Sequence, residues 1–125
     1  MATTKYIDAY VLTVPKDKVE TYRKMATFGR DTWMSCGALA YRECMGDDLH
    51  PDMGEMMKDT PFPVLTNATE NETVWFSYIE YHSKEHRDEV NKKVYEVMME
   101  QTGKEWEEMQ MRVFSYGGFT VEVAS

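Results

Sequence analysis

The stretch TVWFSYIEYHSKEHRDEVNKKV, residues 73–94, decides the fold because a strand pattern passes directly into a helix pattern within it. Residues 73–82 are rich in aromatic and β-branched side chains, which favour a β-strand. Ser83 is a residue type that caps helices, and the helix pattern continues through Gln101. Its inner face repeats apolar residues at helical spacing: Val90, Val94, Val97 and Met98. We therefore expect a strand at 73–82 and a helix from 83 to 101.

The flanking segments supply the remaining elements. Upstream, residues 5–14 (KYIDAYVLTV) and 38–45 (ALAYRECM) predict two more strands, and residues 16–35 between them predict a helix with an apolar stripe. Downstream, residues 112–123 (RVFSYGGFTVEV) predict the last strand. The paired glycines Gly117–Gly118 inside it indicate a bulge, a sharp bend or the close approach of another backbone. The order of elements is thus β-α-β-β-α-β.

This order is the split unit of the ferredoxin-like fold, an α+β architecture in which both helices cover one face of a four-stranded antiparallel sheet. A chain of 125 residues fits one domain, residues 1–125. The second sheet face has no helix to cover it, and an uncovered apolar face marks an interface or a ligand groove. We expect that open face to carry Tyr10, Leu12, Phe76, Tyr78 and Phe119. A homodimer that closes two such faces on each other, a dimeric α+β barrel, would bury them.

Composition restricts the class of partner. Lys and Arg number 14 against 22 Asp and Glu, a net charge of -8, which repels the phosphates that a nucleic-acid-binding protein neutralises. No apolar run approaches the roughly 20 residues of a membrane-spanning helix. The two cysteines lack C-x-x-C spacing, and the N-terminal stretch MATTKYIDAY has no secretion signal. We therefore expect a cytoplasmic protein that binds neither nucleic acid nor membrane.

Three stretches carry a resemblance to a known family: YRECMGDD at 41–48, YHSKEHRDEVNKKV at 81–94 and YGGFTVEV at 116–123. A fourth stretch, KYIDAYVLTVPKDKVETYRKMA, is at 5–26. Together the four stretches resemble a YbaA-like family of small bacterial proteins classed as a domain of unknown function. That family is similar to the dimeric α+β barrel superfamily, which includes antibiotic-biosynthesis monooxygenases and haem-degrading enzymes. The resemblance implies the fold and transfers none of these activities.

Charged residues on the predicted strands form the first candidate site. Asp8, Glu80 and His82 are candidates for proton transfer, and Arg42 and Tyr78 are candidates to line the same cavity. This grouping assumes that the even-numbered residues of the first and third strands share one face with Arg42. The alternative is a structural ion pair with a histidine at the dimer contact, because interface networks also perturb pKa values. A shift of the second strand by one residue would put Glu43 in place of Arg42.

Aromatic residues form a second group of candidates, which would line a ligand cleft. The residues in this group are Tyr10, Trp33, Tyr78 and Tyr116, joined by Arg42. Trp33 is on the stripe of the first helix, where aromatic residues more commonly form plain core. We expect no bound metal and no cofactor, since the acidic run Asp47 to Glu55 matches no zinc or calcium spacing and no phosphate-binding loop is present.

Three functions remain open at this point. The first is a homodimeric barrel that binds a small apolar or aromatic ligand in the cleft between sheet and helices. The second is a cofactor-free monooxygenase or isomerase of the barrel superfamily. The third is docking of a protein partner on the long connection 46–72, through Met53, Met56, Met57 and Phe62. Within that connection we expect a helical turn at 55–58 and, after it, a segment broken by prolines.

Overall fold

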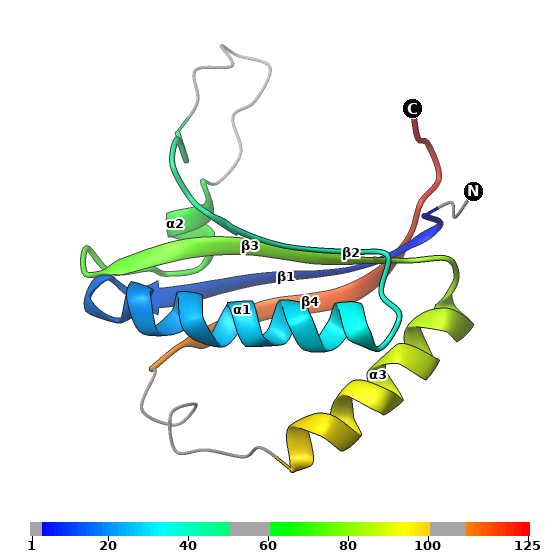
Figure 1. The fold of residues 1–125 in the computed structure, drawn as a ribbon. Coiled ribbons are helices and arrows are strands. Elements are labelled where there is room, and N and C mark those ends of the chain that lie inside the picture. The colour runs from blue at the N-terminus through cyan, green and yellow to red at the C-terminus, as the bar shows by residue number, and fades with distance from the viewer. Residues whose placement is uncertain (1–3, 51–60, 101–109) are drawn as a thin grey trace.

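One antiparallel sheet with two long helices on a single face makes up the architecture (Figure 1). The structure is a computed structural model that describes residues 4–50, 61–100 and 110–125. In chain order the elements are β1 (Tyr6–Pro15), the 3-10 turn η1 (Lys16–Lys18), α1 (Val19–Ser35), β2 (Ala40–Met45), α2 (Phe62–Leu65), β3 (Glu72–Tyr81), α3 (Lys84–Met99) and β4 (Arg112–Thr120).

The strand order is β2-β3-β1-β4, and every neighbouring pair is antiparallel. This order fits the ferredoxin-like arrangement predicted from the sequence, and the α+β prediction is confirmed. The two central strands pair over their whole length, from Tyr6 opposite Tyr81 to Pro15 opposite Glu72. The two central strands, β1 and β3, therefore form an uninterrupted ladder beneath the helices.

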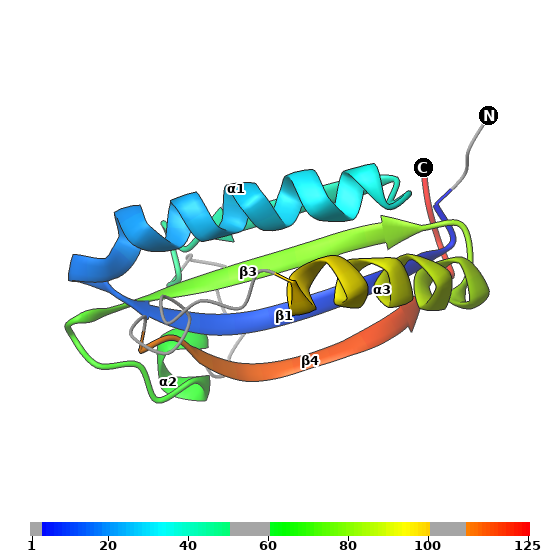
Figure 2. The same ribbon diagram turned by 60° about the horizontal axis from the view of Figure 1, so that its bottom comes forward.

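Helices α1 and α3 lie side by side on the same face of the sheet (Figure 2). Under α1, a core cluster joins residues of α1, β1 and β3: Leu12, Val14, Tyr22, Met25 and Trp75. Under α3, a second cluster includes Ala38, Ile79, Tyr81, Val90 and Val94. The helix-covered face thus has two core clusters, and Tyr10 packs against both of them.

Helix boundaries follow the capping residues that the sequence offers. The Ser83 side chain accepts a hydrogen bond from the backbone N–H of His86, as a helix cap does, and this leaves His82 outside the helix as expected. Gly37 follows the end of α1 with a φ of 114°, which L residues other than glycine adopt with strain. Both helix ends therefore lie where the sequence places them.

The assignment of β1 to the open face is wrong. Leu12 is 4% exposed beneath α1, and Tyr10 lies on the same helix-covered face, whereas both were expected on the open face. Directly paired residues of an antiparallel sheet share a face, and Leu12 pairs with Trp75 while Val11 pairs with Phe76. The prediction holds for Phe76 and Phe119, which are 42% and 59% exposed on the uncovered face.

Two local predictions need correction. Residues Phe62–Leu65 form the short helix α2, although the prolines there predicted a broken segment; Pro63 falls in the first turn, where its missing N–H removes no helical hydrogen bond. The register shift between β1 and β4 falls at Val11–Leu12 and not at the paired glycines. At Gly118 the Tyr6 ring instead packs against the backbone and occupies the space that a Cβ would need. The turn expected at 55–58 lies outside the described residues.

Candidate functional site

A cavity of about 160 Å³ lies between α1 and the sheet. Apolar and aromatic side chains form most of its wall, and Glu43 and Ser77 are its polar members. The residues that line it come from β1, α1, β2, β3 and the start of β4: Tyr10, Leu12, Tyr22, Met25, Ala26, Gly29, Trp33, Tyr41, Glu43, Ser77, Ile79, Met111 and Val113. A space of this composition suits a small apolar molecule that carries one polar group.

Small residues of α1 leave room for the polar end of this cavity. A Cβ added to the buried Gly29 would lie 2.9 Å from the Tyr41 hydroxyl, so the glycine allows the Tyr41 ring to reach under the helix. Trp33 lies beside the same ring, at a centroid distance of 5.8 Å. The Trp33 Nε1 in turn donates to Asn91 Oδ1 at 3.3 Å, which ties α1 to α3.

Glu43 is partly buried and accepts three hydrogen bonds, each from a side-chain hydroxyl. The hydroxyls of Tyr22 and Ser77 donate to its Oε2 at 2.7 Å and 2.5 Å. The Tyr41 hydroxyl donates to its Oε1 at 3.0 Å. These donors come from α1, β3 and β2, so the carboxylate is held from three elements and its position is fixed.

The tyrosines around Glu43 are held in their protonated form. Burial, with the Glu43 charge as the next cause, raises the pKa of Tyr22 and of Tyr41 well above its usual value. Burial also raises the pKa of Tyr10, on the adjoining wall, to about 12. At neutral pH these hydroxyls are therefore donors, and the Tyr22 and Tyr41 hydroxyls can serve the carboxylate.

A second hollow of about 410 Å³ adjoins the cavity and shares Ala26, Tyr41 and Glu43 with it. Arg23 and Arg30 of α1 line this hollow. Their guanidinium groups pair with carboxylates on the same helix, Arg23 with Glu20 and Arg30 with Asp31. Glu43 thus stands between an apolar cavity and a more polar, open one.

A different carboxylate occupies the α3 end of the same sheet face. Asp8 is 3% exposed, and its Oδ1 accepts from Arg87 Nη1 at 2.7 Å. Its Oδ2 is buried without a hydrogen-bond partner within the described residues. Burial raises the pKa of the Asp8 carboxyl, and the charge of Arg87 opposes that rise. Arg87 also lies over the Tyr6 ring, at 5.1 Å from its centroid.

The charged candidates predicted to share one cavity are divided between the two faces. Arg42 Nη1 pairs with Glu80 Oε2 at 3.1 Å and lies over the Tyr78 ring on the open face. Asp8 lies on the helix-covered face, so its predicted grouping with Glu80 is wrong. The reason is the register, in which Asp8 pairs with Ile79 and Ile7 with Glu80.

His82 follows β3 and is exposed, beyond the cavity wall. Its backbone N–H donates to His86 Nδ1 at 3.0 Å, and the two imidazole rings lie 4.9 Å apart. Neither Glu80 nor His82 lines the cavity, so the structure does not bring the three proton-transfer candidates together.

Three of the four aromatic candidates line the cavity or extend its wall. Tyr10 and Trp33 line the cavity. Tyr116 stacks on Tyr10, with ring centroids 6.2 Å apart, and so extends the aromatic wall toward the sheet edge at β4. Tyr78 lies on the opposite face, where its ring is 5.9 Å from that of Phe76. Sequence reasoning thus located part of the cavity wall.

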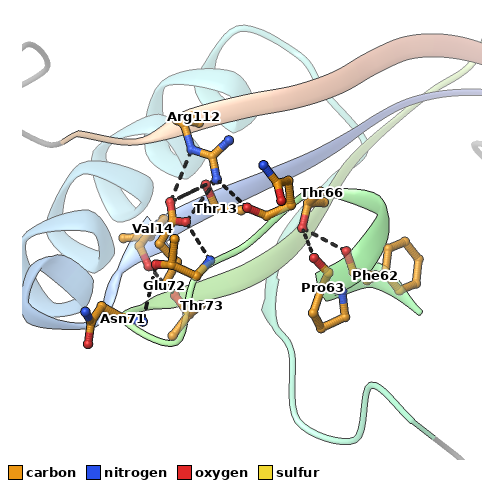
Figure 3. Close-up of polar contacts among 11 residues, drawn as sticks. Thr13, Val14, Phe62, Pro63, Thr66, Asn71, Glu72, Thr73 and Arg112 are labelled. Atoms are coloured by element: carbon orange, nitrogen blue, oxygen red, sulfur yellow. Dashed lines mark hydrogen bonds and ion pairs between the residues drawn. The ribbon is translucent and has the colours of Figure 1, made fainter. Parts of the chain in front are cut away.

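An ion pair between β4 and β3 lies at the far end of the sheet, where β1, β3 and β4 meet α2 (Figure 3). Arg112 Nη2 donates to Glu72 Oε1 at 2.9 Å, and the Thr13 hydroxyl donates to Glu72 Oε2 at 3.0 Å. The hydrogen bond from Arg112, assisted by a backbone N–H of Thr69, lowers the pKa of Glu72 to about 2. Arg112 also donates to the carbonyl of Asn67, so this cluster secures the loop after α2.

Within the described ranges, no group of three or more His, Cys, Asp or Glu side chains could hold a metal ion. No helix in the described part of the chain is long and apolar enough to cross a membrane.

Sequence reasoning chose Arg42 as the site residue of this strand and named Glu43 only as its replacement after a one-residue shift; alternation puts Tyr41 and Glu43 on one face and Arg42 and Cys44 on the other. The missing information was which of these faces meets the helices. Polarity gives no answer in β2, because each face carries one charged residue in the segment YREC. The pairing of Tyr41 with the buried Ile79 decides it, and that register is visible only in the structure.

Fold and cavity together define a small α+β protein with a ferredoxin-like sheet and a ligand-sized space under its first helix. Residues 5–114 match the family described as "Protein of unknown function (DUF1428)", and the chain belongs to that family. The uncharacterized protein YbaA of Escherichia coli (strain K12) is 44% identical over 90 residues, which cover 72% of this chain and 73% of YbaA. An uncharacterized protein YbaA of Shigella flexneri matches with the same values. The resemblance predicted from the sequence is confirmed.

Proposed function

We propose that this protein binds a small apolar or aromatic molecule in the cavity under α1. The observation that carries the proposal is a space of about 160 Å³ whose walls are mostly apolar and which has one fixed carboxylate. An apolar cavity of about 150 Å³ is large enough for benzene. The ligand is therefore about the size of one aromatic ring with a short substituent.

Methionine methyl groups report on this cavity directly. Met25 and Met111 line it, whereas Met99 is exposed at the end of α3. Titration of ¹³C-methyl-methionine protein with toluene or phenol is expected to shift the Met25 and Met111 signals and leave Met99 in place. Ala26→Leu fills the cavity and is expected to remove these shifts, while Lys24→Leu on the exposed side of α1 retains them. Equal shifts in all three proteins would contradict binding in the cavity.

We further propose that two copies associate through the open sheet face. Support comes from Phe76 and Phe119, which are exposed there, and from the Arg42–Glu80 pair beside them. A face with both charges can be self-complementary about a two-fold axis, as a symmetric dimer requires. Sedimentation is expected to give a dimer that Phe119→Asp dissociates. Tyr95→Asp, at an exposed aromatic residue of α3, is the matched control that keeps the dimer.

A proton-transfer enzyme without a cofactor is the second candidate, and the position of Glu43 favours it. The carboxylate lines the cavity and also the adjoining open hollow, so a proton taken from a ligand could pass to solvent. Such an isomerase would remove a proton from the carbon beside a carbonyl and return one to the resulting enolate. In D₂O, a single-ring ketone is then expected to exchange that proton for deuterium with the wild-type protein and not with Glu43→Gln. Equal exchange rates in both proteins would exclude this role for Glu43.

A further inference from the structure

The hydrogen bonds of Glu43 leave one position open. A carboxylate has two oxygens with about four acceptor positions in all. Among the residues that the structure describes, Oε2 accepts from Tyr22 and Ser77, and Oε1 accepts from Tyr41 alone. Because all three donors are fixed by the fold, the fourth position, on Oε1, is available to a ligand donor.

Glu43 also has no cationic partner in the described part of the chain. Among residues 4–50, 61–100 and 110–125, the side chains that hydrogen-bond to Glu43 are neutral hydroxyls, and none of the ion pairs includes it. The nearby Arg23 and Arg30 pair with Glu20 and Asp31. A carboxylate at an apolar cavity gains most from a partner of opposite charge.

The cavity wall suits a cation as well. Aromatic ring faces attract ammonium groups, and the wall contains Tyr10, Tyr22, Trp33 and Tyr41. The net charge of -8 favours the approach of cations over anions. Size, charge and aromatic lining therefore agree on one chemical class.

We propose that the cavity selects a protonated amine on a single-ring-sized apolar body, with the ammonium group bound to Glu43 and the ring among Tyr10, Trp33 and Met25. This inference rests on the proposed ligand-binding function and names its ligand class. An ammonium group supplies a hydrogen-bond donor, for which Glu43 Oε1 has room. It also supplies a positive charge, which the described neighbours of Glu43 do not provide. A neutral alcohol of the same shape supplies only the donor.

A pair of matched probes tests the proposal. 2-Phenylethylamine and 2-phenylethanol share the ring and the chain and differ in the charged group. By calorimetry near neutral pH, we expect the amine to bind at least about 10-fold more tightly, equivalent to about 1.4 kcal/mol. Glu43→Gln is expected to abolish that preference while still binding the alcohol. Glu89→Gln removes an exposed carboxylate of α3, away from the cavity, and is the control that retains the preference.

The outcomes separate the two proposals. Equal binding of amine and alcohol to the wild-type protein would overturn amine selection and leave the ligand-binding function intact. An amine preference that persists in a folded Glu43→Gln protein would also overturn it, because selection would then come from another group. If neither probe shifts the Met25 and Met111 signals, the ligand-binding function itself fails. Should Glu43→Gln not fold, the comparison of the two probes on the wild-type protein decides.

Discussion

Two carboxylates on the helix-covered face of the sheet differ in their partners: one pairs with a cation and the other accepts from neutral hydroxyls. Asp8, under α3, is buried and has an arginine 2.7 Å away that comes from the helix above it. Glu43, under α1, is partly buried and has three hydroxyls around it instead. A buried charge needs a compensating charge or an array of hydrogen bonds. The fold supplies the first to Asp8 and the second to Glu43.

This difference separates a structural pair from the carboxylate that we propose binds a ligand. Arg87 fills the space over Asp8 with its own guanidinium, and the Tyr6 ring lies beneath that group. Over Glu43 the space stays open as a cavity of about 160 Å³. Glu43 thus differs from Asp8 less in its burial than in having no cation of the protein beside it among the described residues, which is why we propose it as the ligand-binding carboxylate.

The largest effect is expected from Arg87→Met, which breaks the structural pair. The substitution leaves a buried carboxylate without its cation, and such losses cost about 3–5 kcal/mol. Because burial already raises the pKa of Asp8, the folded variant holds a proton there more tightly than the unfolded chain. The loss is therefore expected to be smaller at about pH 5 than at about pH 8.

Urea unfolding at both pH values measures this effect. Arg30→Met is the control, because Arg30 pairs with the exposed Asp31, and exposed pairs contribute only about 0–1 kcal/mol. Similar losses in the two variants would mean that the Asp8–Arg87 pair is no more than a surface interaction.

A pair of glycine substitutions compares the packing of the two regions. Gly118→Ala places a methyl group in space that the Tyr6 ring occupies, and overpacking of this kind costs about 1–3 kcal/mol. Gly29→Ala meets the Tyr41 hydroxyl, which can shift into the cavity, and alanine improves helix propensity by about 1 kcal/mol. Thermal unfolding is expected to show a clear loss for Gly118→Ala and a much smaller change for Gly29→Ala. A larger loss of stability for Gly29→Ala than for Gly118→Ala would contradict an open cavity at Tyr41.

Glu43→Gln is expected to change the free energy of unfolding by less than about 1.5 kcal/mol. The amide oxygen can still accept from two of the three hydroxyls, the amide nitrogen can donate to the oxygen of the third, and no cation among the described residues loses its partner. Chemical denaturation of this variant next to Arg87→Met measures the contrast. A loss as large as that of Arg87→Met would make Glu43 a structural residue.

The smallest effect concerns Glu72 on the opposite side of the sheet. Its pKa is lowered from 4.5 to about 2 by Arg112, so the folded state holds this proton less tightly than the unfolded chain. The stability that the pair adds is fully present above the unfolded pKa and is lost as pH falls through the folded pKa. Arg112→Gln is therefore expected to reduce stability slightly near neutral pH, with a loss that shrinks as pH falls below about 4.5 and disappears below about pH 2. Acid titration of both proteins by circular dichroism would show this; a constant difference at all pH values would contradict the ion pair.

The sequence predicts the fold well because its patterns are local. Strand alternation, the Ser83 cap and the apolar stripe of residues 16–35 each depend on neighbouring residues, and the elements that they predict lie where expected. The site depends instead on register. Asp8 was assigned to the face of Glu80 because both numbers are even, but an antiparallel pair in which Asp8 meets Ile79 puts them on opposite faces. Tyr10 and Trp33 were found from their type, whereas Glu43 required knowledge of which face of β2 meets α1.

A crystal structure of the protein with 2-phenylethylamine bound tests the central claim most directly. We predict the ammonium nitrogen at about 2.7–2.9 Å from Glu43 Oε1, as in charge-assisted hydrogen bonds, with the ring packed between Tyr10 and Trp33. The hydroxyls of Tyr22, Tyr41 and Ser77 would keep their bonds to the carboxylate. An amine that points away from Glu43, or a ring outside the cavity, would show that this carboxylate does not bind the ligand.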